Sequence, residues 1–502
     1  MDRANFERLL KAGAFQDEEE GTPNSLRPAD FTDTSTAQVF AREKKGKLVY
    51  TKALGWLCWD GKRWEASDLK AAAHVMEFTG NMLQEAKKNH EDALHRLADT
   101  KAQLAVGDAT RDDVTNASAE VKDALAFLNH AMQSRSKSRS EAILMMSRPY
   151  LAIEAEKLDA NPEDLNTPIG IIDLATGKLR PHTPAALCSH MTSAAPGTAG
   201  ADMWIAFLET VTDGDNSLMG FLQLVAGMAL HGKVYHEGMI LAYGSGRNGK
   251  STFWNALLSV LGDYAGTIDV GILTTDRQNR GAALATLRGK RLVVAGELEE
   301  GKRLSVATVK QICSTDKITI EEKYKAPESV TPSHSLVLYT NYLPRVGSMD
   351  NGTWRRLQVV PFNAKIPAGK AVANFGDVLV AEAGPAILAW AIEGAVNFAR
   401  NGHKLDIPAA VEEVTDTYRQ RENWLDNFLD ECCVREPNAR AGAAELYSTY
   451  KEWAASNGDY ERRMTDFNAA MEAAGYQKIS PKNRKTWVGV RVGQRARYSQ
   501  AM

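Results

Sequence analysis

The sequence predicts an α/β protein with a largely parallel sheet in the middle of the chain, a mostly helical part before it and a smaller mixed unit after it. Short apolar runs at 239–243, 291–295 and 335–340 alternate with helical or loop segments, the pattern of a parallel sheet covered by helices. Residues 69–151 are rich in helix-forming residues. We expect domains at 1–198, 199–412 and 413–502, with residues 1–35 flexible.

The composition is that of an ordinary globular protein. The chain has 502 residues, a formal charge of −3, 44 % hydrophobic and 25 % charged residues, which excludes wholesale disorder, a collagen-like rod and a membrane bundle. Five cysteines without a CxxC pair predict neither a disulfide framework nor a zinc site, and favour a cytoplasmic location. No apolar run approaches 18 residues, so we expect no signal peptide and no membrane partner.

The first part of the chain is expected to hold a small β-structure and long helices. Residues 48–67 predict two strands around the turn signal Asp60-Gly61, with Trp56, Trp59 and Trp64 spaced to pack. Residues 69–151 predict a pair of long helices or a helical hairpin, interrupted at Gly107-Asp108. We favour helices packed on their own domain over a coiled coil, because the apolar spacing does not persist over several heptads.

The remaining elements follow in order. A strand pair with a turn at Thr176-Gly177 precedes a Pro/Ala/Gly/Ser-rich stretch, where we place the first boundary. Helices are expected between about Met203 and Leu230 and again over 379–400. The last unit should contain several helices and end in a strand at 486–492.

The strongest functional signal is a glycine-rich motif between an apolar run and a helical segment. Residues 244–251, Gly-Ser-Gly-Arg-Asn-Gly-Lys-Ser, match G-x-x-x-x-G-K-[ST] in the strand–loop–helix context that a phosphate-binding loop (P-loop) requires. Glycines allow backbone N–H groups to turn toward phosphate oxygens, and the helix N-terminus adds partial positive charge. The motif predicts binding of ATP and Mg²⁺ by Gly244, Gly246, Asn248, Gly249, Lys250, Ser251 and Thr252. Within this set, Lys250 reaches the phosphates and Ser251 ligates the metal.

Three further residues complete a candidate catalytic set. Glu297 follows an apolar strand, where a P-loop enzyme needs a carboxylate for Mg²⁺ and water. Asn341 follows the next strand and offers an amide to orient the attacking water. Arg356, in the sequence Thr-Trp-Arg-Arg, is a candidate arginine finger for a neighbouring subunit's nucleotide; a structural arginine bound to carboxylates is the alternative.

The order of these motifs resembles the superfamily 3 helicases, and more closely the helicase part of phage, plasmid and poxvirus primase-helicases. The segments AGELEEG, TNYLP and GTWRRLQVVPF look like that family's flanks, and the likeness covers about residues 45–490. The resemblance implies a P-loop AAA+-like core that assembles into a ring, which we expect to be a hexamer. ATP hydrolysis at subunit interfaces then moves DNA through a central channel, with single-stranded DNA in the channel and forked or duplex DNA at its entrance.

The resemblance also assigns a DNA contact and leaves one assignment open. The family places a β-hairpin with a basic tip between the acidic strand and the Asn strand, and Lys323, Tyr324 and Lys325 occupy that place. The family's pair of adjacent acids is absent, because Gly296 precedes Glu297 and Leu298 follows it. Glu299 is a candidate second Mg²⁺ ligand, so the division of roles between the two glutamates stays open.

The last unit combines helices with basic residues and resembles a winged helix, with Lys482 to Lys485 on the wing. We therefore expect a replicative, ATP-dependent DNA helicase of a phage, satellite or plasmid replicon, acting in a bacterial cytoplasm. Fewer than 50 residues precede the Trp-rich segment, so we expect no primer synthesis and consider a separate primase a possible partner. The alternative is a P-loop ATPase switch or loader that binds DNA or a replication partner without unwinding.

Overall fold

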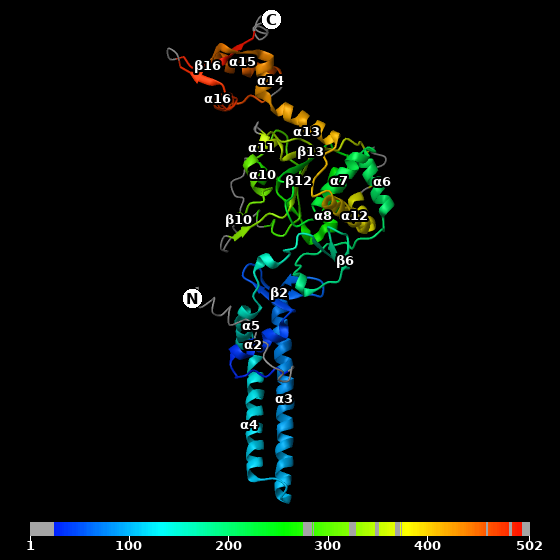
Figure 1. The fold of residues 1–502 in the computed structure, drawn as a ribbon, viewed down its shortest axis with the longest axis vertical. Helices are drawn as coiled ribbons and strands as arrows, with labels where there is room; N and C mark the ends of the chain where they lie inside the picture. Colours follow the sequence, from blue (N-terminus) through cyan, green and yellow to red (C-terminus); the bar gives the residue numbers. More distant parts are fainter. Residues whose placement is uncertain are drawn as a thin grey trace.

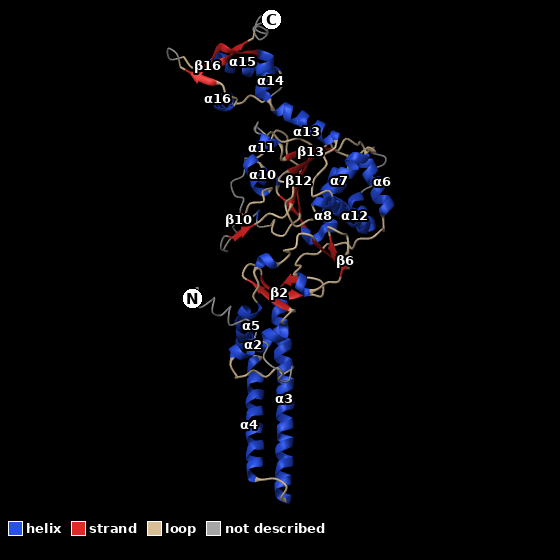
Figure 2. Ribbon diagram, viewed as in Figure 1, coloured by secondary structure: helices blue, strands red, loops and turns tan. Residues whose placement is uncertain are grey.

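The computed structural model describes residues 25–274, 284, 286–320, 328–346, 351–366, 372, 374–457, 460–480 and 484–493. These residues form a mixed α/β protein with a central parallel sheet and a helical N-terminal part, as the sequence predicts (Figures 1 and 2). Most of the segment expected to be flexible, residues 1–24, lies outside the described residues. The expected domain boundaries stay a prediction.

The N-terminal part is a small sheet joined to a long helical hairpin. The elements are α2 (Asp33–Lys44), β1 (Leu48–Thr51), β2 (Gly55–Trp59), β3 (Trp64–Ala66), α3 (Asp68–Val106), α4 (Arg111–Ser134) and α5 (Lys137–Leu151). Ser67 caps the start of α3, and Gly107 ends it in the left-handed conformation (φ +86°). Figure 1 shows α3 and α4 side by side, projecting away from the rest of the molecule.

The two halves of this hairpin differ in burial. Near the body, Phe40, Phe78 and Phe127 pack in one core with α2 and α5. Farther out, Leu94, Val106 and Leu125 are exposed. The predicted helices and the break between them are therefore confirmed. The expected packing against the chain's own N-terminal part is found only for the half of the hairpin that lies near the body.

A connecting segment leads from the hairpin to the central sheet. It contains η1 (Ala155–Lys157), β4 (Asp164–Thr167), β5 (Gly170–Asp173), β6 (Leu179–Arg180) and η2 (Pro184–Ala186). The strands β4, β5 and β6 form a small antiparallel sheet. Leu165, Ile172 and Leu174 pack in the same core as the helices that follow. This segment is thus built onto the central part of the protein.

The central sheet has five parallel strands in the order β13-β7-β12-β9-β8. Their bounds are β7 (Met239–Tyr243), β8 (Ala265–Ile268), β9 (Leu292–Gly296), β12 (Ser335–Thr340) and β13 (Leu357–Pro361). The strands are buried on both faces, which explains their continuous apolar runs. β7, β9 and β12 confirm the three predicted runs, whereas β8 and β13 were not predicted from the sequence.

Helices cover both faces of this sheet. One core joins the sheet to α6 (Ala201–Val211), α7 (Asn216–Met228), α8 (Lys250–Leu261) and α12 (Phe375–Arg400). A second core joins its other face to η4 (Val270–Leu273), α10 (Val306–Ile312) and α11 (Asn351–Trp354). The short helix η3 (Gly262–Tyr264) precedes β8, and β10 (Ile318–Ile320) pairs antiparallel with β11 (Glu328–Val330).

Helix α12 is long and apolar enough to cross a membrane by length and composition alone. Its apolar side chains have another partner, because Leu379, Ile387 and Leu388 are buried in the core that α12 shares with α7 and α8. Burial in the protein core therefore accounts for its composition.

The C-terminal unit follows the connecting helix α13 (Ala409–Glu422). It consists of α14 (Trp424–Cys432), β14 (Cys433–Gly442), α15 (Ala443–Ser456), α16 (Met464–Ala473), β15 (Gln477–Ile479) and β16 (Thr486–Val492). The strands form an antiparallel sheet in the order β14-β16-β15. Phe428, Tyr450, Phe467 and Trp487 form its own core. β16 confirms the predicted final strand, and β14 is a further strand that was not predicted.

Candidate active site

The sheet order brings the predicted catalytic residues to one edge. β7 lies beside β12, and β12 lies beside β9, all running in the same direction. Residue 244 begins the glycine-rich loop after β7, Glu297 follows β9, and Asn341 follows β12. Because the carboxyl ends of parallel strands meet at one edge of a sheet, the three segments converge there, where α/β proteins bind ligands.

The loop 244–249 has a backbone that its residue types explain. Gly246 and Gly249 have φ of +98° and +77°, which glycine adopts without steric cost. A Cβ on Gly244 would lie 2.1 Å from Asn248 Nδ2 and 2.3 Å from the carbonyl oxygen of Phe362. That space is taken because Asn248 Nδ2 donates to Phe362 O at 2.8 Å. Asn248 thereby ties the loop to the end of β13.

Lys250 begins α8 and is 6 % exposed. Its ammonium group donates to Asn341 Oδ1 at 2.5 Å and to Gly244 O at 3.1 Å, and Asn248 Oδ1 lies 3.5 Å away. Burial lowers the pKa of Lys250, and the nearby Glu297 carboxylate acts in the opposite direction. The structure thus brings Lys250, Asn341 and Glu297 together. The next residues of α8 are Ser251, which is exposed, and Thr252, which is half-buried.

Glu297 has an unusual backbone and a clear difference from Glu299. Its φ of +53° is uncommon for a residue with a side chain, and its N–H donates to Tyr339 O at 3.0 Å. Glu299 is exposed and forms an ion pair with Lys302 at 3.4 Å. The carboxylate whose charge acts on Lys250 is therefore that of Glu297.

Tyr339 explains why a glycine precedes Glu297. A Cβ on Gly296 would lie 2.5 Å from the hydroxyl oxygen of Tyr339, its partner across the strands. Burial, and then the charge of Glu297, raise the pKa of Tyr339. An acidic side chain at position 296 would require Tyr339 to move from its present place, so the tyrosine disfavours an acidic residue there. Sequence reasoning missed Tyr339, although its place two residues before Asn341 was a usable signal.

Arg356 makes its contacts within the chain. Its guanidinium donates to Glu237 Oε2 at 3.0 Å and to Gly352 O at 2.7 Å, and the side chain is 14 % exposed. Its neighbour Arg355 is exposed. Within a single chain, Arg356 is thus a structural arginine bound to a carboxylate, the alternative considered from the sequence. The role of Arg356 as an arginine finger for a neighbouring subunit stays a prediction.

The expected DNA contacts are placed only in part. The hairpin stem, β10 and β11, lies between β9 and β12 in the chain as predicted. Its tip, with Lys323, Tyr324 and Lys325, lies outside the described residues. In the C-terminal unit, Arg484 and Lys485 are exposed, whereas Lys482 lies outside the described residues. Burial, followed by the charge of Lys485, lowers the pKa of Lys478, whose ammonium lies 5.0 Å from the ring centre of Trp487.

A cavity of about 440 Å³ lies near the glycine-rich loop, between the ends of β7 and β13 and the helix α13. Its walls include Tyr243, Pro361, Tyr418 and Arg421. Tyr243 belongs to the core on the face of the sheet away from α8. The cavity therefore lies apart from the group formed by Lys250, Asn341 and Glu297.

Two protein families match separate parts of the chain. Residues 37–213 match the family described as "D5 N terminal like", and residues 242–356 match a family of unknown function. The second range begins in β7 and includes Lys250, Glu297 and Asn341.

Similar proteins come from large DNA viruses. "Putative helicase L207/L206" of Acanthamoeba polyphaga mimivirus is 26 % identical over 383 residues, which are 71 % of this chain and 40 % of that protein. "Putative primase C962R" of African swine fever virus is 24 % identical over 278 residues, 51 % of this chain and 29 % of that protein. The chain thus spans less than half the length of these relatives.

Among solved structures, an apo structure of the NrS-1 C-terminal region matches with 12 % identity and a TM-score of 0.39. The match covers 60 % of this chain and 78 % of that one. The sequence comparisons carry the relationship: this chain is similar to proteins named as helicases and primases of large DNA viruses, and the resemblance that its motifs indicate is confirmed.

Proposed function

We propose that the protein is an ATP-dependent replicative DNA helicase that acts as a ring, with a P-loop AAA+-like core and a winged-helix-like C-terminal unit. One observation carries the proposal: Lys250, Asn341 and Glu297 meet at the carboxyl edge of the parallel sheet, directly beside the glycine-rich loop. The names of the viral relatives support a role in DNA replication.

The residues at this edge fit a nucleoside triphosphate with Mg²⁺. The ammonium of Lys250 donates to two oxygen acceptors, Gly244 O and Asn341 Oδ1. A side chain at position 244 would clash with Asn248 and with the carbonyl oxygen of Phe362, so the glycine keeps the loop in this conformation. Phosphate oxygens would replace these acceptors around the same charge. Ser251 and Glu297 would hold Mg²⁺, and the metal would neutralise charge on the phosphates.

Hydrolysis then follows from the same residues. Asn341 would orient the attacking water, and Glu297 would accept its proton, since Glu299 turns to Lys302 instead. In the ring, a guanidinium from the next chain would stabilise the transferred phosphoryl group. Lys323, Tyr324 and Lys325 would contact DNA in the channel, and Arg484 and Lys485 would contact phosphates outside it.

The alternative is an ATPase switch or loader that does not separate strands. The ion pair between Arg356 and Glu237 favours this alternative, because an arginine held within its own chain does not complete a neighbour's site. As a helicase, the protein must release Arg356 from Glu237 on assembly or use Arg355, which is exposed.

Strand separation on forked DNA distinguishes the two functions. The purified chain, ATP and Mg²⁺ should release a labelled strand, and Lys250→Ala should not. A folded wild-type protein that hydrolyses ATP at the same rate with and without DNA, and separates no strands, would contradict the helicase and favour the switch or loader.

A further inference from the structure

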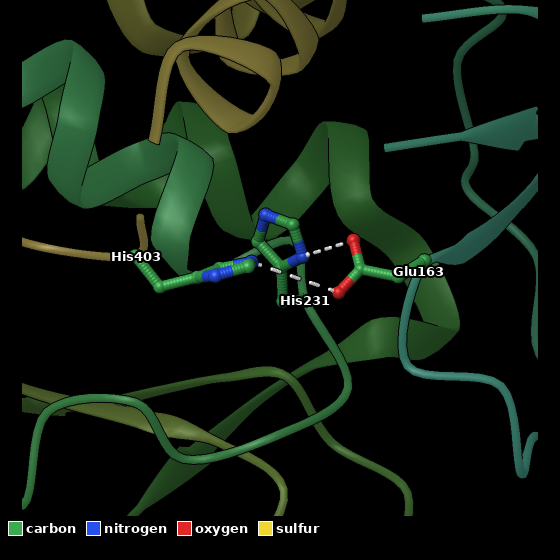
Figure 3. Close-up of side chains that lie close together, drawn as sticks. All are labelled: Glu163, His231 and His403. Atoms are coloured by element: carbon green, nitrogen blue, oxygen red, sulfur yellow. Dashed lines mark ion pairs between the residues drawn. The ribbon is translucent and has the colours of Figure 1, made fainter. Parts of the chain in front are cut away.

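A second cluster, of side chains that could bind a metal ion, lies away from the glycine-rich loop. Glu163, His231 and His403 each place one possible ligand atom within 4.8 Å of the others. Figure 3 shows both imidazole rings beside the Glu163 carboxylate, with dashed lines to its two oxygens. His231 Nδ1 lies 2.9 Å from Glu163 Oε2, and His403 Nε2 lies 3.9 Å from Glu163 Oε1.

Several atoms of this cluster lack a hydrogen bond of ordinary geometry. They are buried, and at the centre of the cluster they comprise Glu163 Oε2, His231 Nδ1 and His403 Nε2, of which the first two face each other as an ion pair. His231 itself is 1 % exposed. Buried polar atoms are normally hydrogen-bonded. One such atom from each of the three residues lies within 4.8 Å of the others, which is the spacing of a group that shares one partner.

The surrounding residues hold the cluster in place. Tyr235 donates its hydroxyl to Glu163 Oε1 at 2.9 Å, and its ring stacks on His403 with centres 4.2 Å apart and planes within 1°. Arg291 donates to the carbonyls of Leu230 and Asp164, the residues adjacent to His231 and Glu163, at 2.6 and 2.7 Å. Contacts of this kind orient ligands in known metal sites.

His403 lies in a strained backbone position. It follows the end of α12 with a φ of +60°, in the left-handed region that a residue with a side chain seldom adopts. Its N–H donates to Phe398 O at 2.9 Å, which closes the helix end and fixes that conformation. Strain of this kind persists where the surrounding structure holds it, often at a binding site.

We propose that Glu163, His231 and His403 bind a divalent transition-metal ion, Zn²⁺, which joins the connecting segment before β4 to the ends of α7 and α12. Two imidazoles and a carboxylate are ligands that zinc takes, with water in a fourth position. Ligand atoms of a tetrahedral zinc site lie about 3.4 Å apart. The three candidate ligand atoms lie within 4.8 Å of one another, and each imidazole approaches a different oxygen of Glu163, so a bound ion would need small shifts of these side chains.

Charge makes Glu163 the most sensitive ligand. The guanidinium of Arg291 lies close to the cluster and opposes a second cation, so an ionised carboxylate is needed to offset it. Glu163→Gln keeps the shape and the oxygen that Tyr235 contacts but removes the charge. His403→Ala removes a ligand that is only half-buried, which makes it the variant less apt to disturb folding.

The test uses the full chain, freed of any histidine tag, stripped with a chelator and reloaded with Zn²⁺ in excess Mg²⁺. Mass spectrometry of the metal content should give one zinc per wild-type chain. Glu163→Gln and His403→Ala should bind zinc at least about 10–100-fold more weakly, the loss that removal of a residue supporting a ligand already causes. His95→Ala, which changes an exposed histidine on α3, should bind it normally. Cobalt in place of zinc should give the absorption of a low-coordinate site in the wild type and in His95→Ala, but not in Glu163→Gln or His403→Ala.

Two outcomes would overturn the proposal: wild-type protein that binds no zinc, or zinc bound equally by all variants with circular dichroism unchanged. Either result would mean that the cluster is a buried His–Glu pair without a metal. Lys250→Ala should bind zinc like the wild type, so failure of this site and failure of the nucleotide site are separate results.

Discussion

At the residue scale, Lys250 has its charge buried among oxygens of its own chain. Gly244 O and Asn341 Oδ1 accept its hydrogen bonds, and burial lowers its pKa. A cation kept in a half-desolvated position interacts strongly with an anion that enters the same space, because water no longer screens it. In the proposed function, this arrangement would hold the charge in place before a nucleotide binds.

The first prediction is that Lys250→Ala lowers the rate of ATP hydrolysis about a hundredfold or more, because it removes the charge that stabilises the phosphates. The measurement is phosphate release at saturating Mg²⁺. The matched control is Lys87→Ala, which removes an exposed lysine on α3 and should keep the wild-type rate. A Lys250→Ala protein with more than a tenth of wild-type activity would contradict the proposed site.

The second prediction separates the two arginines. Arg356→Ala should lower the free energy of unfolding by about 1–3 kcal/mol, since it breaks two hydrogen bonds and leaves Glu237 without its ion-pair partner. Arg355→Ala, on an exposed side chain, should change it by less than about 0.5 kcal/mol. Thermal unfolding of both variants measures the difference.

The same pair tests action between chains. If Arg356 completes a neighbour's site, Arg356→Ala and Lys250→Ala are each inactive alone, and a mixture regains activity because one partner supplies the arginine and the other the lysine. A mixture as inactive as its parts, together with an inactive Arg355→Ala that recovers on mixing, would transfer the role to Arg355.

The third prediction concerns His334, which is buried just before β12 and whose ring nitrogens make no hydrogen bond of ordinary geometry. Burial lowers its pKa to about 4. In the unfolded chain its pKa is about 6.5, so between pH 6.5 and 4 only the unfolded state takes up the proton. Stability should fall over that window by on the order of 3 kcal/mol, with no contribution above it.

His334→Met removes this proton uptake while keeping an apolar side chain of similar size. The stability of the variant relative to the wild type should therefore rise as the pH falls from 7 to 4, because carboxylates common to both proteins cancel in the comparison. Thermal unfolding at several pH values measures it. A constant difference across that range would mean that His334 is protonated or hydrated in the folded protein.

The sequence predicted which residues gather at the carboxyl edge of the sheet better than it predicted their surroundings, and nucleotide binding there stays a prediction. Lys250, Glu297 and Asn341 follow from a motif and from strand ends, which the sequence displays directly. Glu237 could not be found this way, because it meets Arg356 across 119 residues of chain. The number and spacing of the cysteines did not indicate the cluster of Glu163, His231 and His403, whose residues come from three distant segments. Contacts set by tertiary packing leave no local pattern.

At the element scale, the glycine-rich loop is fitted closely against α6. A Cβ on Gly249 would lie 2.3 Å from Val211 Cγ1 and 3.3 Å from the ring of Phe207. Gly249 also has a φ of +77°. The loop therefore depends on both the backbone freedom of glycine and the absence of a side chain.

The fourth prediction uses a second glycine with the same backbone. Gly214, between α6 and α7, also has a φ of +77°, and among the described residues no atom lies within 4 Å of the place that a Cβ would take there. Gly214→Ala should show only the backbone cost, about 1 kcal/mol. Gly249→Ala should cost about 1–3 kcal/mol more because of overpacking. Equal melting temperatures for the two variants would show that the loop yields without cost.

The elements that were predicted and those that were not differ in the interactions that stabilise them. β7, β9 and β12 were predicted because strands buried on both faces need continuous apolar residues. β14, with the sequence CVREPNARAG, was not, because it is an edge strand held by backbone pairing to β16 around an irregularity between Arg435 and Arg440. The helices α3 and α4 were predicted because residues 69–151 are rich in helix-forming residues and Gly107-Asp108 interrupts them. The Thr110–Asp113 capping box that starts α4 was found only in the structure.

At the scale of the whole molecule, the candidate active site and the C-terminal unit lie in separate cores. α13 packs on β13 and belongs to the central part, whereas α14 to β16 have a core of their own. Figure 1 places this unit at the end of the molecule opposite to the α3–α4 hairpin. If the proposed function holds, DNA binding by the C-terminal unit should therefore be separable from ATP hydrolysis at the central sheet.

The fifth prediction tests this separation with the double variant Arg484→Ala and Lys485→Ala, which removes two exposed charges from the turn before β16. If both contact phosphates, the affinity for DNA should fall, and the slope of log K against log salt should decrease by about 2, since each contact releases about one counterion. Lys451→Ala, whose ammonium pairs with Glu461 at 2.8 Å, is the control from the same unit. Hydrolysis without DNA should be unchanged in both proteins. A double variant with the wild-type salt slope would place the DNA contacts of this chain elsewhere, with the hairpin tip at Lys323 and Lys325 as the next surface to test.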